Sequence, residues 1–158
     1  MKAIFLDIDG VLNSEKFWEK EAQHVRKKKA IAEGRSHDEA SAIANMDPDA
    51  VERIMRIVKE TGAEIVVSST WKYDDNLNYK LRFMGISNTY GITPWSRDRH
   101  RGSEIKEWLD EHPEVTSYVI IDDDSDMLEE QKSHFVQTSW HDGINDHNVE
   151  KAIKILNN

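Results

Sequence analysis

The sequence predicts an α/β fold: a doubly wound, Rossmann-like parallel sheet with helices on both faces. A short, unbroken apolar run at residues 3–6 and two mainly apolar segments, residues 63–67 and 117–121, are typical of strands buried on both faces of a parallel sheet. Segments with helical spacing of apolar residues alternate with these runs, as in sheets that are covered by helices. In such a sheet the ligand binds beyond the carboxyl ends of the strands, so the residues after each run are candidates for function.

The bulk composition limits the classes of protein to consider. A chain of 158 residues suits one domain with a sizeable core, and we expect residues 1–158 to form a single domain. The net charge of −9 argues against a general binder of nucleic acid or anionic membranes. No apolar run approaches the roughly 20 residues of a membrane span, and the first strand leaves no room for a signal peptide. With no cysteine either, the sequence predicts a cytoplasmic protein.

The first strand covers residues 3–6 and runs directly into Asp7-Ile8-Asp9-Gly10-Val11-Leu12. In extended chain Asp7 and Asp9 point the same way. Two carboxylates this close are unfavourable unless they share a proton or a cation lies between them. Gly10 lets the chain turn away and lets a ligand approach the backbone. The end of the first strand is therefore a candidate metal or phosphate site.

A polar segment, residues 13–45, follows this motif and predicts a small helical insertion. It contains a basic run at residues 26–29 and a break at Gly34, after which Ser36 or His37 can begin a second short helix. Two interpretations are open. The segment is either an exposed helical hairpin with a solvated charged face, or a small cap whose basic run meets an anionic substrate.

The middle of the chain predicts a helix followed by the second strand. Asp47 can cap this helix, Pro48 fits its first position, and Gly62 is placed to end it. The strand at residues 63–67 then delivers residues 68–72, Ser-Ser-Thr-Trp-Lys, at its carboxyl end. Ser68 and Ser69 are therefore expected on the same sheet edge as the first motif.

The following segments continue the alternation. Apolar spacing predicts a helix that ends at Gly85, whereas residues 86–94 have the composition of turns. Ser103 can cap a further helix that stops before Pro113. The third strand, residues 117–121, ends in a run of acids that begins with Asp122 and Asp123.

The C-terminal part predicts a fourth strand and a last helix. Residues 135–138 are typical of a strand, and Asp146 can cap a helix whose apolar face turns inward. We see no internal repeat, low-complexity tract or linker in the chain.

The three strand ends support phosphoryl transfer. An aspartate such as Asp7 can act as the nucleophile and form an aspartyl-phosphate. Asp9 can protonate the leaving oxygen and then deprotonate water. Magnesium prefers oxygen ligands, which Asp7 offers together with Asp122 and Asp123. The sequence thus predicts a phosphoryl-transfer site that uses Mg²⁺.

Donors for the phosphate oxygens complete the predicted site. Ser68 can donate a hydrogen bond to a phosphate oxygen, and Ser69 is the alternative. A cation must meet the remaining oxygens. Arg101 is the first choice because it lies near a predicted helix start facing the crevice, while Arg99 and Lys106 compete for this role.

These motifs resemble those of the haloacid dehalogenase (HAD) superfamily of phosphotransferases. Residues 7–12 match its first motif, D-x-D-G-[VT]-[LV], and Ser68 matches the second, a Ser or Thr at the end of the next strand. Residues 120–123 match the fourth motif, an apolar strand that ends in D-D or G-D. The third motif, a Lys or Arg at a helix start, falls on Arg101. The resemblance implies a HAD-type phosphatase with Mg²⁺ as its cofactor.

The resemblance also implies a role for each acid. Asp7 would be the nucleophile and a metal ligand, and Asp9 would be the general acid and base. The backbone carbonyl of Asp9 would also ligate the metal. Of the later pair, the second acid is the usual ligand in the superfamily, so Asp123 is favoured over Asp122.

One branch of the superfamily is more similar. Asp47-Pro48 with its helix, residues 61–71, residues 101–109 and Gly143-Ile144 look like the small HAD domains associated with RNA repair and the phosphatase half of phage polynucleotide kinase. This likeness implies a phosphate monoester on a nucleotide or at a nucleic-acid 3′ end. The branch often has Arg where this chain has Lys72. A lysine would meet the phosphate with a single compact charge, whereas an arginine can form two parallel hydrogen bonds to it.

We therefore expect a phosphomonoesterase whose partner is a phosphorylated small molecule or a nucleic-acid end; no protein partner is evident. The residues expected to contact the substrate are Ser69, Gly10, Lys72 and Arg99.

Two alternatives are open. The first is a small-molecule phosphatase that acts on mononucleotides or sugar phosphates. The second is a non-catalytic module, such as a phosphoacceptor receiver domain or an inactive HAD fold. A receiver domain has its acid pair after the first strand and its phosphorylated Asp after a later one. Here the pair at residues 122–123 comes late, and that order favours the phosphatase.

Overall fold

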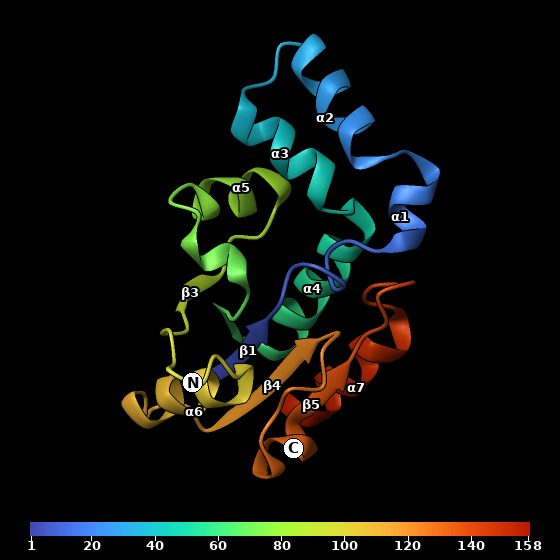
Figure 1. The fold of residues 1–158 in the computed structure, drawn as a ribbon. Helices are drawn as coiled ribbons and strands as arrows, with labels where there is room; N and C mark the ends of the chain where they lie inside the picture. The colour runs from blue at the N-terminus through green and yellow to red at the C-terminus, as the bar shows by residue number, and fades with distance from the viewer.

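A computed structural model describes all residues, 1–158. Its centre is a five-stranded, all-parallel sheet in the order β3-β2-β1-β4-β5 (Figure 1). The α/β, Rossmann-like fold expected from the sequence is confirmed, with the first strand in the middle of the sheet. The strands are β1 (Lys2–Leu6), β2 (Glu64–Val67), β3 (Thr89–Ile92), β4 (Ser117–Asp122) and β5 (Phe135–Gln137).

Alternate residues of the central strands pack into two separate cores. Ile4 and Leu6 belong to the larger core, which contains apolar residues of α4 (Pro48–Thr61), α5 (Leu77–Met84) and α7 (Asp146–Leu156). Phe5 points to the opposite face and packs edge-on against Trp108 of α6 (Arg101–Glu111). This two-sided burial explains why β1 carries no polar residue between Ala3 and Leu6.

The insertion after β1 forms three helices, where the sequence suggests a hairpin. They are α1 (Glu15–Lys20), α2 (Gln23–Ala32) and α3 (His37–Asn45). Ser36 caps α3 in a capping box with Glu39, as its position after Gly34 suggests. The three helices lie beyond the end of the sheet to which β1 and β4 point (Figure 1). No helix of the protein combines the length and the apolar character that a membrane span requires.

Helix α4 has the ends expected from the sequence. Asp47 accepts a hydrogen bond from the backbone N–H of Asp49, and Pro48 occupies the first turn. Gly62 ends the helix in the left-handed conformation, at a φ of 71°. The next chain segment then enters β2 at Glu64.

The structure corrects three details of the expected elements. Residues 86–94 are not turns alone, because Thr89–Ile92 forms β3 at the sheet edge beside β2. Helix α6 begins at Arg101 with His100 as its cap, so Ser103 lies inside its first turn. The last helix is capped by Asn145 rather than Asp146. Short 3₁₀ helices η1 (Thr70–Tyr73) and η2 (Glu129–His134) complete the fold.

Candidate active site

The register of the sheet brings three of the expected site residues together. Leu6 of β1 pairs with Val67 of β2 on one side and with Ile121 of β4 on the other. The next residue of each strand is Asp7, Ser68 or Asp122. The backbone N–H of Asp7 donates to the Ile121 carbonyl (3.1 Å), and that of Ser68 donates to the Leu6 carbonyl (2.9 Å). The three side chains therefore start from one line at the carboxyl edge of the sheet.

Three carboxyl groups converge at this edge. Oxygen atoms of Asp7, Asp122 and Asp123 all lie within 4.8 Å of one another. Asp7 and Asp122 are buried, whereas Asp123 is partly exposed. Arg101 is the cation nearest to them: its Nη1 lies 3.2 Å from an Asp7 oxygen and 3.3 Å from Asp122 Oδ2.

Burial and mutual repulsion disfavour the charged forms of these acids. Burial raises the pKa of Asp7 to about 6, while Arg101 lowers it in part. The pKa of Asp122 is raised further, to about 8, first by burial and then by the Asp7 charge beside it. One arginine therefore does not neutralise the cluster, and a further cation would stabilise its ionised form.

The donor set fits a magnesium ion. All three groups offer oxygen atoms, which Mg²⁺ prefers. Asp122 Oδ2 is buried and accepts no hydrogen bond, although Arg101 lies close to it. The hydroxyl of Ser68 is likewise buried without a partner. Unpaired buried polar atoms are unusual, and here both lie at the expected position of a metal ion with its phosphate.

The backbone conformation and a close contact with Asp123 both favour glycine at position 10. Its φ is 80°, in the left-handed region that glycine adopts without strain. A Cβ at this position would collide with the carboxyl group of Asp123. Glycine therefore lets the loop after β1 approach the acid from the loop after β4. This is a more specific role than the approach of a ligand that the sequence suggests.

Asp9 is held by two hydrogen bonds that the sequence does not reveal. The indole Nε1 of Trp71 donates to its Oδ2 (3.1 Å), and the Asn13 side chain donates to its Oδ1 (2.9 Å). Asn13 also donates to the carbonyl of Asn45 (2.8 Å), at the far end of the insertion. Asp9 is thus fixed between η1 and both ends of residues 13–45. The only sequence signal for these partners is their position beside the motifs.

The three competing cations have different surroundings. Arg101 begins α6 and contacts the acid cluster. Arg99 lines the adjoining cavity together with Arg101. Lys106 is exposed and pairs with Asp110 one helical turn away, at 2.7 Å. Of these three cations, Arg101 is the one that contacts the acid cluster.

A cavity of about 600 Å³ opens beside the cluster, and Ser68, Ser69, Lys72, Arg99 and Arg101 are among its lining residues. The ammonium of Lys72 already has three acceptors: Glu104 (2.8 Å), the Pro94 carbonyl (3.0 Å) and the Thr93 hydroxyl (3.4 Å). Since an ammonium has three donor hydrogens, Lys72 has none free for a phosphate in this arrangement.

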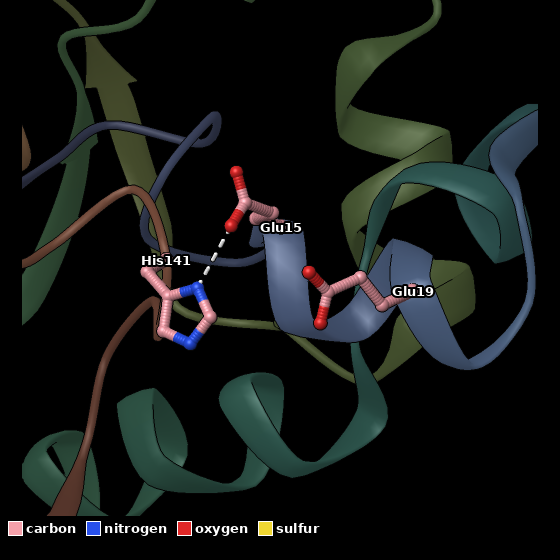
Figure 2. A group of neighbouring side chains, drawn as sticks. All are labelled: Glu15, Glu19 and His141. Carbon is pink, nitrogen blue, oxygen red and sulfur yellow. Dashed lines mark hydrogen bonds and ion pairs between the residues drawn. The ribbon is translucent and has the colours of Figure 1, made fainter.

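A second group of ionisable side chains lies outside this site (Figure 2). Glu15 and Glu19 of α1 face His141, and His141 Nδ1 lies 2.9 Å from Glu15. The neighbouring carboxylate of Glu15 raises the pKa of His141. All three residues are exposed, so we interpret the group as a surface contact between α1 and the loop before α7.

One comparison with known proteins gives a match. A family model described as the HAD domain in Swiss Army Knife RNA repair proteins matches residues 3–149. No curated protein and no solved structure matches the chain. The matched range includes the loops after β1, β2 and β4 and the start of α6, which together form the site. The chain therefore belongs to the family of HAD domains found in Swiss Army Knife RNA repair proteins.

Proposed function

We propose that this protein is a magnesium-dependent phosphomonoesterase that works through an aspartyl-phosphate on Asp7. Membership of a HAD family supports a phosphatase-type activity. The observation that carries the proposal is the convergence of Asp7, Asp122 and Asp123 with Arg101 at the carboxyl edge of the sheet. This set combines a carboxylate nucleophile, acidic metal ligands and a cation for the phosphate oxygens.

In the first step, a carboxylate oxygen of Asp7 attacks phosphorus, and the bond from phosphorus to the leaving oxygen breaks. Asp9 gives its proton to that leaving oxygen. Arg101 and the free hydroxyl of Ser68 bind phosphate oxygens. Asp7, Asp123 and Asp122, with the backbone carbonyl of Asp9, would hold Mg²⁺, which offsets the repulsion between carboxylate and phosphate when bound.

In the second step, Asp9 is a carboxylate and takes a proton from water. The water oxygen attacks phosphorus, and the bond between phosphorus and Asp7 breaks. Inorganic phosphate leaves, Asp7 is a free carboxylate again, and Asp9 is protonated for the next cycle. The hydrogen bonds from Trp71 and Asn13 keep Asp9 in one place for both transfers.

We propose that residues 13–45 act as a small cap within a single HAD-like domain. The segment begins at Asn13 and ends at Asn45, and these two residues are joined by a hydrogen bond beside Asp9. Its last helix, α3, contacts α5 through the Tyr79 hydroxyl, which donates to Glu39 (2.8 Å). The insertion is thus anchored beside Asp9 at its two ends and on α5 through α3.

For the substrate, we propose a phosphate monoester on a nucleotide or at a nucleic-acid 3′ end. The description of the family as domains of RNA repair proteins supports this class. So does the pair of arginines, Arg99 and Arg101, in the cavity beside the cluster. The net charge of −9 favours the second candidate, a phosphatase of mononucleotides or sugar phosphates, because long polyanions are repelled.

A panel of substrates tests this proposal. Phosphate release is measured with 3′-phosphorylated RNA and DNA oligomers, 5′-phosphorylated oligomers, nucleoside monophosphates and sugar phosphates, each with Mg²⁺ or with EDTA. We expect EDTA to stop release and the 3′-phosphorylated oligomers to have the highest kcat/KM. A kcat/KM for these oligomers no better than for free mononucleotides would reject the end-specific reading and leave the mononucleotide phosphatase.

A further inference from the structure

The cavity beside the acid cluster continues into a second one. The first, of about 600 Å³, reaches from Ser68 and Arg101 outward. The second, of about 400 Å³, runs on toward Trp108 and His112 of α6 and its C-cap. Both are lined by Lys72, Tyr73 and Trp95. The three shared residues define one groove that leads away from the phosphate position.

The two aromatic residues of this groove are exposed to solvent. Tyr73 is 63% exposed and Trp95 is 53% exposed. Ile92, which also lines the outer cavity, is 49% exposed. Exposed large apolar side chains that gather at a site indicate a binding surface. Here they line the walls of a groove whose inner end holds the proposed catalytic residues.

A buried ion pair fixes the backbone beside both aromatic residues. Lys72 and Glu104 are 2.8 Å apart, and their side chains are only 4% and 9% exposed. Tyr73 follows Lys72 directly in η1. Trp95 lies between two backbone groups that bind the same pair: the Pro94 carbonyl accepts from Lys72, and the Ser96 N–H donates to Glu104 (3.3 Å).

The inner end of the groove carries free positive charge. Arg99 lines it and is exposed, with a φ of 56° in the left-handed region. Asp98 fixes this turn, because it accepts hydrogen bonds from the hydroxyls of Ser96 (2.7 Å) and Ser103 (2.8 Å). A phosphate at the acid cluster would therefore have an arginine beside it and aromatic rings beyond.

We propose that this groove binds the nucleobase of the nucleotide that carries the phosphate, with the base against Trp95 and Tyr73. The inference rests on the proposed phosphatase function, and it adds the group that the enzyme recognises outside the phosphate. Base–aromatic stacking tolerates any base, because every base has a π-face. The ligand class is a single-stranded nucleic-acid end, since a stacked terminal base cannot also be stacked in a duplex.

The test pairs removal of the ring with removal of the base. Trp95→Ala and Tyr73→Ala are compared with the wild type on a short 3′-phosphorylated RNA and on the same RNA with an abasic 3′-terminal nucleotide. We expect each variant to lose roughly tenfold or more in kcat/KM on the intact RNA. On the abasic RNA the loss should be at most about twofold, since no base is there to stack.

Two control variants accompany the test. Trp95→Phe keeps a ring and should recover most of the activity on intact RNA. Trp140→Ala removes another exposed tryptophan, 45% exposed and outside the groove, and should behave as the wild type on both substrates. If Trp95→Ala and Tyr73→Ala lost kcat/KM equally on intact and abasic RNA, the proposal would be overturned in favour of a structural role for the rings. Unchanged kcat/KM on the intact RNA would overturn it as well.

A binding measurement separates this inference from the proposed function. The affinity of both RNAs is measured by fluorescence anisotropy in EDTA at one fixed salt concentration, because phosphate contacts are strongly salt-dependent. Trp95→Ala should weaken binding of the intact RNA. The difference in affinity between the intact and the abasic RNA should therefore be smaller for this variant than for the wild type. If the wild type releases no phosphate but this loss remains, the phosphatase proposal fails while the base site stands. Equal affinities of the wild type for both RNAs would overturn the base site alone.

Discussion

At the scale of single residues, the site depends on atoms that orient the proposed catalytic groups. Asp9 receives a hydrogen bond from Trp71 on one carboxylate oxygen and from Asn13 on the other. These donors act on the substrate only through Asp9, so they are positioning residues. Their effect should depend on how much the leaving group needs a proton.

Trp71→Phe tests this role of the indole. The variant keeps an aromatic ring but removes the Nε1–H that binds Asp9. We expect kcat to fall roughly tenfold for an alkyl phosphate, whose leaving oxygen needs the proton, because a misplaced general acid loses part of the about 10²–10⁴-fold that it contributes. For a nitrophenyl phosphate, which leaves without help, kcat should change little. A similar loss on both esters in steady-state assays would assign Trp71 to packing.

Gly10→Ala tests the close approach between the first and fourth motifs. The new Cβ would displace the carboxyl group of Asp123, and we expect activity to fall to near background. Gly62→Ala is the matched control, because its φ of 71° is also left-handed and no atom lies within 4 Å of its Cβ position. Both variants should lose about 1–3 kcal/mol of stability from the backbone strain, but only Gly10→Ala should lose turnover. Turnover and urea unfolding are measured on both variants, and equal losses of turnover would contradict the role assigned to Gly10.

The raised pKa values of Asp7 and Asp122 predict how stability depends on pH. Both lie above the value of 3.8 that these groups have when unfolded. Between about pH 4 and pH 8 the folded protein therefore binds more protons than the unfolded chain, and the free energy of unfolding falls as pH rises. This loss of stability is complete once the pH exceeds the pKa values that the two groups have in the folded protein.

Asp122→Asn isolates this effect from other titrations. The variant removes one charge from a cluster whose other members are Asp7, Asp123 and Arg101. In urea unfolding with EDTA, we expect the variant to gain stability relative to the wild type as the pH is raised from about 5 to about 8. The gain should be on the order of 1–3 kcal/mol. Parallel stability curves for the two proteins would contradict the assigned repulsion.

At the scale of the elements, the sequence predicts the strands and helices that are marked by a local pattern of residues. Strand β1 and helix α4 follow from local patterns: an apolar run before Asp7, and a cap and stop at Asp47 and Gly62. Strand β3 does not, because Tyr90-Gly91 looks like a turn, and its pairing with β2 creates the strand. Contacts between distant residues, such as Lys72 with Glu104, leave no local pattern at all.

The insertion gives an element whose function can be tested separately. The structure divides its basic run in two. Arg26 is structural, because its guanidinium donates to the carbonyls of Glu21 and Phe17 and lies 3.8 Å over the Phe17 ring. Lys27, Lys28 and Lys29 are exposed on α2. These lysines are the members of the run that can meet an anionic substrate, although Lys29 also lies 3.9 Å from Glu21.

Replacement of the three exposed lysines by glutamine tests the cap. We expect KM for a 3′-phosphorylated oligomer to rise several-fold at low salt while KM for a small phosphate ester changes little, because only a long anion reaches α2. The same change at Lys59, Lys151 and Lys154, on α4 and α7, removes equal charge away from the insertion and serves as the control. A rise in KM with both triple variants would show a general charge effect.

At the scale of the whole molecule, the site is a consequence of strand order. With β1 between β2 and β4, the residues after these strands must meet at one edge. The order of motifs along the sequence therefore predicts that Asp7, Ser68 and Asp122 converge, and they do. It cannot predict that Trp71 binds Asp9, 62 positions earlier, because that contact depends on how η1 folds back over the edge.

The central claim is that Asp7 is the residue that accepts the phosphoryl group. The most direct measurement is an acid-quenched single turnover with a ³²P-labelled ester, followed by digestion and identification of the labelled peptide. Wild type and Asp124→Asn, an exposed acid outside the cluster, should carry hydroxylamine-sensitive label on the peptide that contains Asp7. Asp7→Asn should carry none and should lose nearly all turnover at a melting temperature no lower than that of the wild type, since the change removes a buried charge. Wild-type turnover in Asp7→Asn, or label on another residue, would contradict the mechanism.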